Sequence, residues 1–292
     1  MTYLYIKGII VFDKIIFRRK KKMALKVALQ LYSIREDMAK DYVKAMTEVA
    51  KMGYQGVEFA GFVADPAEMG KLARDLGMEP ISCHYPYAKI VENPEKAFND
   101  CLAAGCKFIV IPWLSRKKEI SDENLDATIA EIAKLGKMAS EAGLTMLYHN
   151  HDFEFDKIDG EYILDKMYRE ISADALKTQL DTCWVNVGGE NPAAFVRKYT
   201  GRAPLVHIKD FSGSKSEGMY ELIGDASTVA NADTNKFRFR PVGYGVQDVP
   251  AIVAAAEDAG AGWVIVEQDQ SIDMPPIEAV KLSRDYLKSI GL

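Results

Sequence analysis

The sequence has few cysteines, no Cys-x-x-Cys pair, and no glycine in the turn where a nucleotide-binding sheet needs one. Only four of its 292 residues are cysteines, and we expect them to be buried, reduced thiols in a cytoplasmic protein. They are Cys83, Cys101, Cys106 and Cys183. The turn after the first expected strand reads QLYSIRE, so it lacks the glycine-rich phosphate turn of an open doubly wound sheet.

Basic residues outnumber acidic ones in the first 22 residues but not in the rest of the chain. The chain has 37 Lys and Arg against 42 Asp and Glu, a net charge of −5. Residues 1–22 hold seven basic residues and one acidic residue, a charge of +6, so the remainder carries −11. Because no basic stripe dominates the body of the protein, we do not expect it to bind nucleic acid.

Residues 1–22 differ in composition from the rest of the chain and do not form a continuous apolar run. Lys7, Asp13 and Lys14 interrupt the run, which is too short for a membrane span. Its basic residues follow the apolar part, whereas those of a secretory signal precede it. Met23 then opens MALKVALQLYS, as a barrel's first strand would begin. We expect an extension over 1–22, a single domain over 23–292 and no membrane partner; a membrane-surface anchor is the alternative.

From Met23 onward, short β-branched runs alternate with longer segments of helical period. The expected strands cover 26–31, 56–59, 80–84, 108–112, 144–149, 176–181, 205–210 and 263–268. The expected helices cover 41–52, 66–76, 94–104, 121–142, 161–171, 191–199, 249–259 and 276–290, and 212–244 is expected to be irregular. Eight such units in about 270 residues predict a closed (β/α)8 TIM barrel. The alternative is an open doubly wound sheet.

All four histidines fall at the carboxyl ends of expected strands, where barrels of this kind have their active sites. His84 ends the third strand, His149 ends the fifth with His151 two residues beyond it, and His207 lies in the seventh. A lone histidine would be more simply explained as a hydrogen-bonded core residue. Four of them converge here with three carboxylates at strand ends, Glu58, Asp181 and Glu267. Imidazoles and carboxylates together favour a site for Mn, Zn, Fe or Co.

Four segments, YHNHDFEF, LDTCW, VHIKD and VIVEQD, resemble the xylose isomerase-like barrels. That family includes sugar phosphate isomerases and epimerases, ketose 3-epimerases, inosose enzymes and apurinic endonucleases, and the resemblance covers nearly all of 23–292. It implies one divalent metal (Mn, Zn, Co, Fe or Mg) held by Glu, Asp, His and Glu from strands five to eight. Here Asp181, His207 and Glu267 match the last three ligands. The strand-five glutamate falls on His149, which removes one of the two carboxylates that serve the epimerases as acid and base.

The resemblance implies an isomerase or epimerase that forms an enediolate on a keto-sugar or related polyol. Glu267 is then the expected base, with His151, Glu154 or Glu58 as the second proton carrier. The residues expected to touch the carbohydrate are Gln30, Glu58, His84, Trp113 and Lys209. The resemblance also implies a homodimer or homotetramer.

Two alternatives of other classes stay open. A lyase, dehydratase or hydrolase acting on a keto-glycoside would use the same enolate and then expel a leaving group, and His149 in place of glutamate keeps this alternative open. A non-catalytic sugar-binding barrel is the other alternative, and the retained Asp181, His207 and Glu267 argue against it. Trp184 stands where the family often has a further histidine, which argues against a multi-zinc endonuclease.

Overall fold

Eight parallel strands close into a barrel in the computed structural model, which describes residues 25–215 and 237–292. The strands are β1 (Lys26–Gln30), β2 (Gly56–Ala60), β3 (Glu79–His84), β4 (Phe108–Ile111), β5 (Thr145–His149), β8 (Lys177–Asp181), β9 (Leu205–Ile208) and β12 (Trp263–Val266). Each pairs with its neighbours in chain order, and β12 returns to β1 with Val264 opposite Val27. The predicted closed barrel is confirmed, and the open-sheet alternative is wrong.

The inside of the barrel changes from apolar to polar along the strands. One buried cluster consists of Ala28, Ile81, Val110, Leu147, Leu205, Trp263 and Ile265. Two residues beyond three of these, the chain carries His149, His207 and Glu267. Because residues two apart on a strand share a face, the polar groups lie above an apolar floor. Strand pairing thereby brings side chains from distant parts of the sequence to one end of the barrel.

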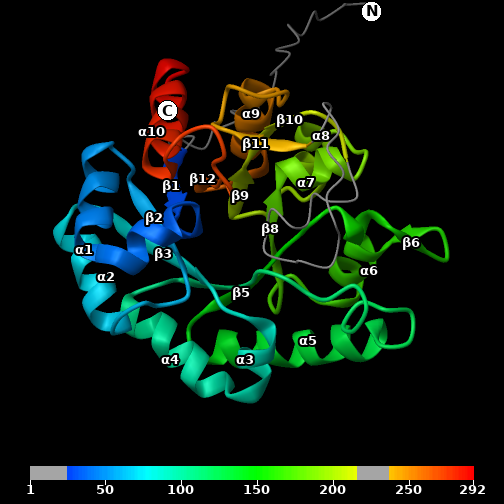
Figure 1. The fold of residues 1–292 in the computed structure, drawn as a ribbon. Helices are drawn as coiled ribbons and strands as arrows, with labels where there is room; N and C mark the ends of the chain where they lie inside the picture. The colour runs from blue at the N-terminus through cyan, green and yellow to red at the C-terminus, as the bar shows by residue number, and fades with distance from the viewer. Residues whose placement is uncertain (1–24, 216–236) are drawn as a thin grey trace, which may run out of the picture.

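Helices surround the strands on the outside (Figure 1). They are α1 (Arg35–Lys51), α2 (Pro66–Asp75), α3 (Tyr87–Glu92), α4 (Pro94–Ala104), α5 (Leu125–Glu141), α6 (Ile163–Glu170), α7 (Thr182–Val187), α8 (Pro192–Lys198), α9 (Val249–Ala259) and α10 (Pro276–Ser289). Local signals explain several boundaries. The Asn93 side chain accepts a hydrogen bond from the Lys96 backbone at the start of α4, and Gly105, with φ of 86°, ends that helix.

Several boundaries differ from the sequence-based expectation. Helix α1 begins six residues earlier than the predicted 41–52, directly after the 3₁₀ turn Leu31–Ile34, and a kink at Asp41 (φ −162°, ψ 89°) separates the two parts. Helix α5 starts later than the predicted 121, because 119–124 form a turn, and the backbone carbonyl of Glu119 accepts a hydrogen bond from the hydroxyl of Thr128 inside α5. Short helices α3 and α7 were not predicted.

Two short hairpin-like sheets also extend from the barrel. One pairs β6 (Lys157–Ile158) with β7 (Glu161–Tyr162), and the other pairs β10 (Asp210–Ser212) with β11 (Arg238–Arg240). The second sheet overturns part of the irregular stretch expected over 212–244. Residues 216–236 of that stretch lie outside the described residues.

The four cysteines are buried and unpaired, as predicted. Within 25–215 and 237–292, every helix is too short or too polar to cross a membrane. The expected extension over 1–22 lies outside the described residues.

Candidate metal centre and adjoining cavity

Four side chains from successive barrel strands meet at one point above the apolar floor. His149 ends β5, Asp181 ends β8, His207 lies in β9 and Glu267 directly follows β12. One donor atom from each lies within 4.8 Å of all the others, and all four residues are buried. Donors about 2.0–2.3 Å from one ion can be at most about 4.6 Å apart. The arrangement is therefore close to that of a single bound ion.

One carboxylate oxygen of Asp181 is left for a cation, either the Lys209 ammonium or a metal ion. Its Oδ1 accepts hydrogen bonds from the backbone N–H groups of Cys183 (2.9 Å) and Trp184 (3.1 Å), which begin α7. Its Oδ2 is buried and accepts no aligned hydrogen bond within the described part of the chain, although Lys209 Nζ lies 3.2 Å away. Burial raises the pKa of Asp181. A buried carboxylate oxygen is costly without a partner, so a cation fits this position.

Glu58 lies beneath the histidines and holds the ring of His207. Its Oε1 contacts His207 Nε2 at 2.7 Å, while His207 Nδ1 faces Glu267 Oε2 at 2.9 Å. Burial would lower the pKa of His207, but Glu58 and Glu267 raise it to about 10. Burial likewise opposes ionisation of Glu58, but His84 and His207 hold its pKa well below the usual range. A carboxylate behind a histidine is the common support for a metal-binding imidazole.

Gln179 supports two other histidines and was missed by the sequence analysis. Its Oε1 lies 2.7 Å from His84 Nε2 and 3.1 Å from His149 Nδ1, and its amide donates to Glu58 Oε2 at 2.5 Å. With Nδ1 on Gln179, His149 presents Nε2 to Asp181 Oδ2, 3.5 Å away. Burial lowers the pKa of His149 and favours the neutral ring that ligates metals. The available signal was position, since Gln179 precedes Asp181 by two residues on one strand face.

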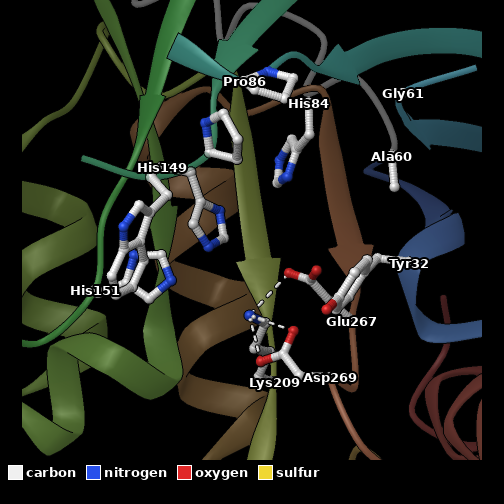
Figure 2. A pocket seen from close by; sticks show the side chains of 12 residues that line it. Tyr32, Ala60, Gly61, His84, Pro86, His149, His151, Lys209, Glu267 and Asp269 are labelled. Atoms are coloured by element: carbon white, nitrogen blue, oxygen red, sulfur yellow. Dashed lines mark hydrogen bonds and ion pairs between the residues drawn. The ribbon is translucent and has the colours of Figure 1, made fainter. Parts of the chain in front are cut away.

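A cavity of about 310 Å³ opens over this cluster, a size suited to a small molecule. It is lined by Tyr32, Ala60, Gly61, His84, Pro86, Pro112, Trp113, His149, His151, Lys209, Glu267 and Asp269. Figure 2 shows His84, His149 and His151 projecting into the same space as Lys209 and Glu267. Proline and tryptophan walls beside imidazoles, an ammonium and carboxylates suit a ligand with both apolar and hydroxyl-bearing faces.

Three residues expected at the ligand or in proton transfer do not line this cavity. Gln30 donates to Glu58 Oε1 at 2.7 Å, so both are held below the cavity floor. Glu154 accepts from the His151 backbone N–H at 2.8 Å and from the Tyr148 hydroxyl, and burial raises its pKa to about 8. These positions make all three supports for the groups that face the cavity. Each of these polar groups forms a hydrogen bond with a buried partner on another strand or turn, which holds it away from the cavity.

His151 and Trp113, by contrast, both line the cavity. Their rings meet edge to face with centroids 4.6 Å apart, and His151 also stacks on Phe153 at 5.5 Å. This packing limits rotation of the imidazole, so the ring is presented to a ligand in a restricted orientation.

Lys209 brings a buried positive charge to the same point. Its ammonium lies 2.9 Å from Glu267 Oε2 and 3.0 Å from Asp269 Oδ2. Burial would lower the pKa of Lys209, but Asp181, Asp269 and Glu267 raise it well above its usual value. Burial opposes ionisation of Glu267 too, yet Lys209 and His207 lower its pKa. Asp269 was not predicted as a site residue, although it follows Glu267 by two residues in VIVEQD.

Comparison with known proteins places this geometry in a family. The model of the xylose isomerase-like TIM barrel matches residues 46–290. An inosose dehydratase of Clostridium botulinum (strain Alaska E43) is 26% identical over 285 residues, covering 86% of this chain and 91% of the relative. A crystal structure of a sugar phosphate isomerase/epimerase from Parabacteroides distasonis has a TM-score of 0.73 at 22% identity, covering 93% of this chain and 96% of that one. The IOLI protein, solved with a zinc atom, has a TM-score of 0.67 at 15% identity, covering 91% and 98%. Because the family model matches most of the chain, the chain belongs to the xylose isomerase-like TIM barrel family.

Proposed function

We propose that this protein is a divalent-metal-dependent dehydratase that removes water from a keto-polyol through an enolate. The observation that carries the proposal is the asymmetric pair at the cavity, in which His149 replaces the carboxylate expected opposite Glu267. Only one carboxylate of the epimerase pair is then present, beside imidazoles. The similarity to inosose dehydratase supports a cyclic or open-chain polyol ketone as the substrate class.

The metal would be held by His149, Asp181, His207 and Glu267. Two imidazoles and two carboxylates suit Zn, Mn, Fe or Co, and the zinc atom in the IOLI structure supports a divalent ion in this fold. When bound, such an ion polarises a carbonyl oxygen and stabilises negative charge that develops on it.

The side chains of this protein supply the proton transfers. Glu267 takes the proton from the carbon next to the carbonyl, and His151, which must first gain a proton because burial lowers its pKa, gives that proton to the hydroxyl that leaves the following carbon as water. The product is an enone or enol, and the proton held by Glu267 returns to His151 through solvent. Trp113 packs against His151, so it positions the acid and closes one wall around the substrate.

An isomerase or epimerase is the second candidate. Glu267 and His151 both line the cavity, so they could serve opposite faces of one carbon and return a proton without loss of the hydroxyl. The similarity to the sugar phosphate isomerase/epimerase supports this reaction on the same fold.

One experiment separates the two. The purified protein, loaded with Mn²⁺, Co²⁺ or Zn²⁺, is incubated with inosose and a panel of keto-sugars in D₂O and followed by NMR. We expect loss of water and an unsaturated or dione product. An epimerised product that carries deuterium and has lost no water would instead establish the epimerase. A metal-loaded protein that catalyses neither reaction nor exchange would leave a non-catalytic sugar-binding barrel.

Substitution of Glu267 and His149 tests the roles of the pair. Glu267→Gln should reduce turnover by roughly 10² or more, the usual contribution of a general base, with metal occupancy measured alongside. His149→Glu restores the missing carboxylate and should keep the metal but slow dehydration, because a further negative charge beside the ion weakens its polarisation of the carbonyl oxygen. His149→Gln is its neutral control. Unchanged dehydration by His149→Glu would remove the basis of the proposal.

A further inference from the structure

The buried Lys209 shares its carboxylate partners with the candidate metal centre. Lys209 is 1% exposed, and its Nζ lies 3.2 Å from Asp181 Oδ2 and 2.9 Å from Glu267 Oε2. Asp181 Oδ2 is the oxygen left over after Oδ1 has accepted two backbone hydrogen bonds. Glu267 Oε2 is the oxygen that faces His207 Nδ1. The ammonium therefore contacts the remaining oxygen of Asp181 and one of the two oxygens through which Glu267 would reach an ion.

An ammonium and a divalent ion compete for the negative charge of these two carboxylates. An ion bound at about 2.0–2.3 Å would place two further positive charges beside Lys209 in a buried site, where charge repulsion is poorly screened. Asp269 provides an alternative position for the ammonium. Its two carboxylate oxygens accept from Lys209 Nζ at 3.2 and 3.0 Å, as Figure 2 shows, and Asp269 is outside the four-residue metal cluster.

We propose that Lys209 is an internal cation that competes with the metal for Asp181 and Glu267 and so sets the metal affinity of the centre. Asp269 is the anchor that retains the ammonium when it gives up those two carboxylates. This inference rests on the proposed metal-dependent function. It assigns Lys209 and Asp269 positioning roles, and it predicts effects of opposite sign for their removal.

The test is a double-mutant cycle on the full-length, chelator-treated protein, with the Kd for Mn²⁺ measured by calorimetry at one fixed pH. Lys209→Met removes the charge but keeps an unbranched side chain, and it should tighten Mn²⁺ binding. A full charge at this distance changes a carboxylate's affinity for a proton by ~10-fold or more, and we expect a similar change here. Asp269→Asn should weaken Mn²⁺ binding, because among the described residues the ammonium then keeps only the metal carboxylates Asp181 and Glu267 as negatively charged partners. Lys71→Met, which removes an exposed lysine paired with Asp75, should leave the Kd unchanged.

The double variant shows whether Asp269 acts by holding the Lys209 ammonium or only by adding negative charge near the metal. If Asp269 acts through Lys209, Asp269→Asn should have a much smaller effect in the Lys209→Met background. An equal effect in both backgrounds, or weaker binding by Lys209→Met, would overturn the inference. General structural damage predicts weaker binding by both single variants. Circular dichroism checks folding, and Lys209→Gln replaces Lys209→Met if the latter does not fold. Failure of the unsubstituted protein to bind Mn²⁺, Zn²⁺ or Co²⁺ would refute the proposed metal function itself.

Discussion

Glu58→Gln tests whether the buried carboxylate beneath the histidines prepares the metal centre. Oε1 of Glu58 accepts from the Gln30 amide and contacts His207, and Oε2 accepts from Ser82 (2.6 Å) and the Gln179 amide. In Glu58→Gln the new NH₂ group replaces either Oε1, where it faces the NH₂ of Gln30, or Oε2, where it faces the NH₂ of Gln179. A buried donor left without an acceptor costs about 1–3 kcal/mol of unfolding free energy.

The same substitution should weaken metal binding. Loss of the carboxylate behind a metal-binding histidine typically reduces metal affinity by 10–100-fold, about 1.4–2.7 kcal/mol. Calorimetric titration with Zn²⁺ or Mn²⁺ measures this change, and thermal unfolding of the chelated protein measures the stability term separately. Glu92→Gln, on the exposed face of α3, is the matched control and should change neither value. A Glu58→Gln protein with unaltered metal affinity and unaltered stability would show that Glu58 does not orient His207.

Other consequences of the structure can be measured independently. Burial raises the pKa of Glu154 to about 8, so the folded state retains a proton that the unfolded state loses near pH 4.5. The free energy of unfolding, measured with urea, should therefore fall between about pH 4.5 and 8, by at most ~1.4 kcal/mol per pH unit. Glu154→Gln should remove this pH dependence. Gly70→Ala should destabilise the protein strongly, since an added Cβ would lie 1.9 Å from a backbone oxygen of α4, whereas Gly262→Ala meets no atom within 4 Å and should be neutral. Metal removal by a chelator should lower the Tm reversibly. The lost stability should be ~2.7 kcal/mol if the free ion was present at 100 times its Kd, and an unchanged Tm would argue against a resident ion. A chain starting at Met23 should melt within a few degrees of the full chain, and a large loss would make residues 1–22 integral to the fold.

Much of the fold could be predicted because its signals are local. Short apolar runs such as FIVI and WVIV, separated by helical segments with Pro or Asn at the start and Gly at the end, mark strands and helices without knowledge of distant contacts. The errors lie where a boundary depends on packing. The first turn of α1 lies before the kink at Asp41, and β11 forms only because β10 lies beside it.

The convergence of the candidate metal residues was also predictable, for a topological reason. Parallel strands in a closed barrel end at the same rim, so Asp181, His207 and Glu267 had to approach one another wherever their strands lay in the sequence. The roles of the other polar residues were not predictable in this way. Glu58 and Gln30 were expected at the ligand, yet both lie beneath the histidines, and Gln179 and Asp269 were not anticipated.

The sequence by itself therefore determined the barrel, its strand order and the end at which polar side chains gather, because periodicity and strand direction are properties of short segments. Only the tertiary structure decided which of those side chains face the cavity and which support them. That choice depends on partners brought together by closure of the sheet, as with Glu58 and His207, whose contact joins residues 149 positions apart. A buried carboxylate turns toward the nearest donors that can satisfy it, and those donors are set by strand pairing and not by the residues beside it in the chain.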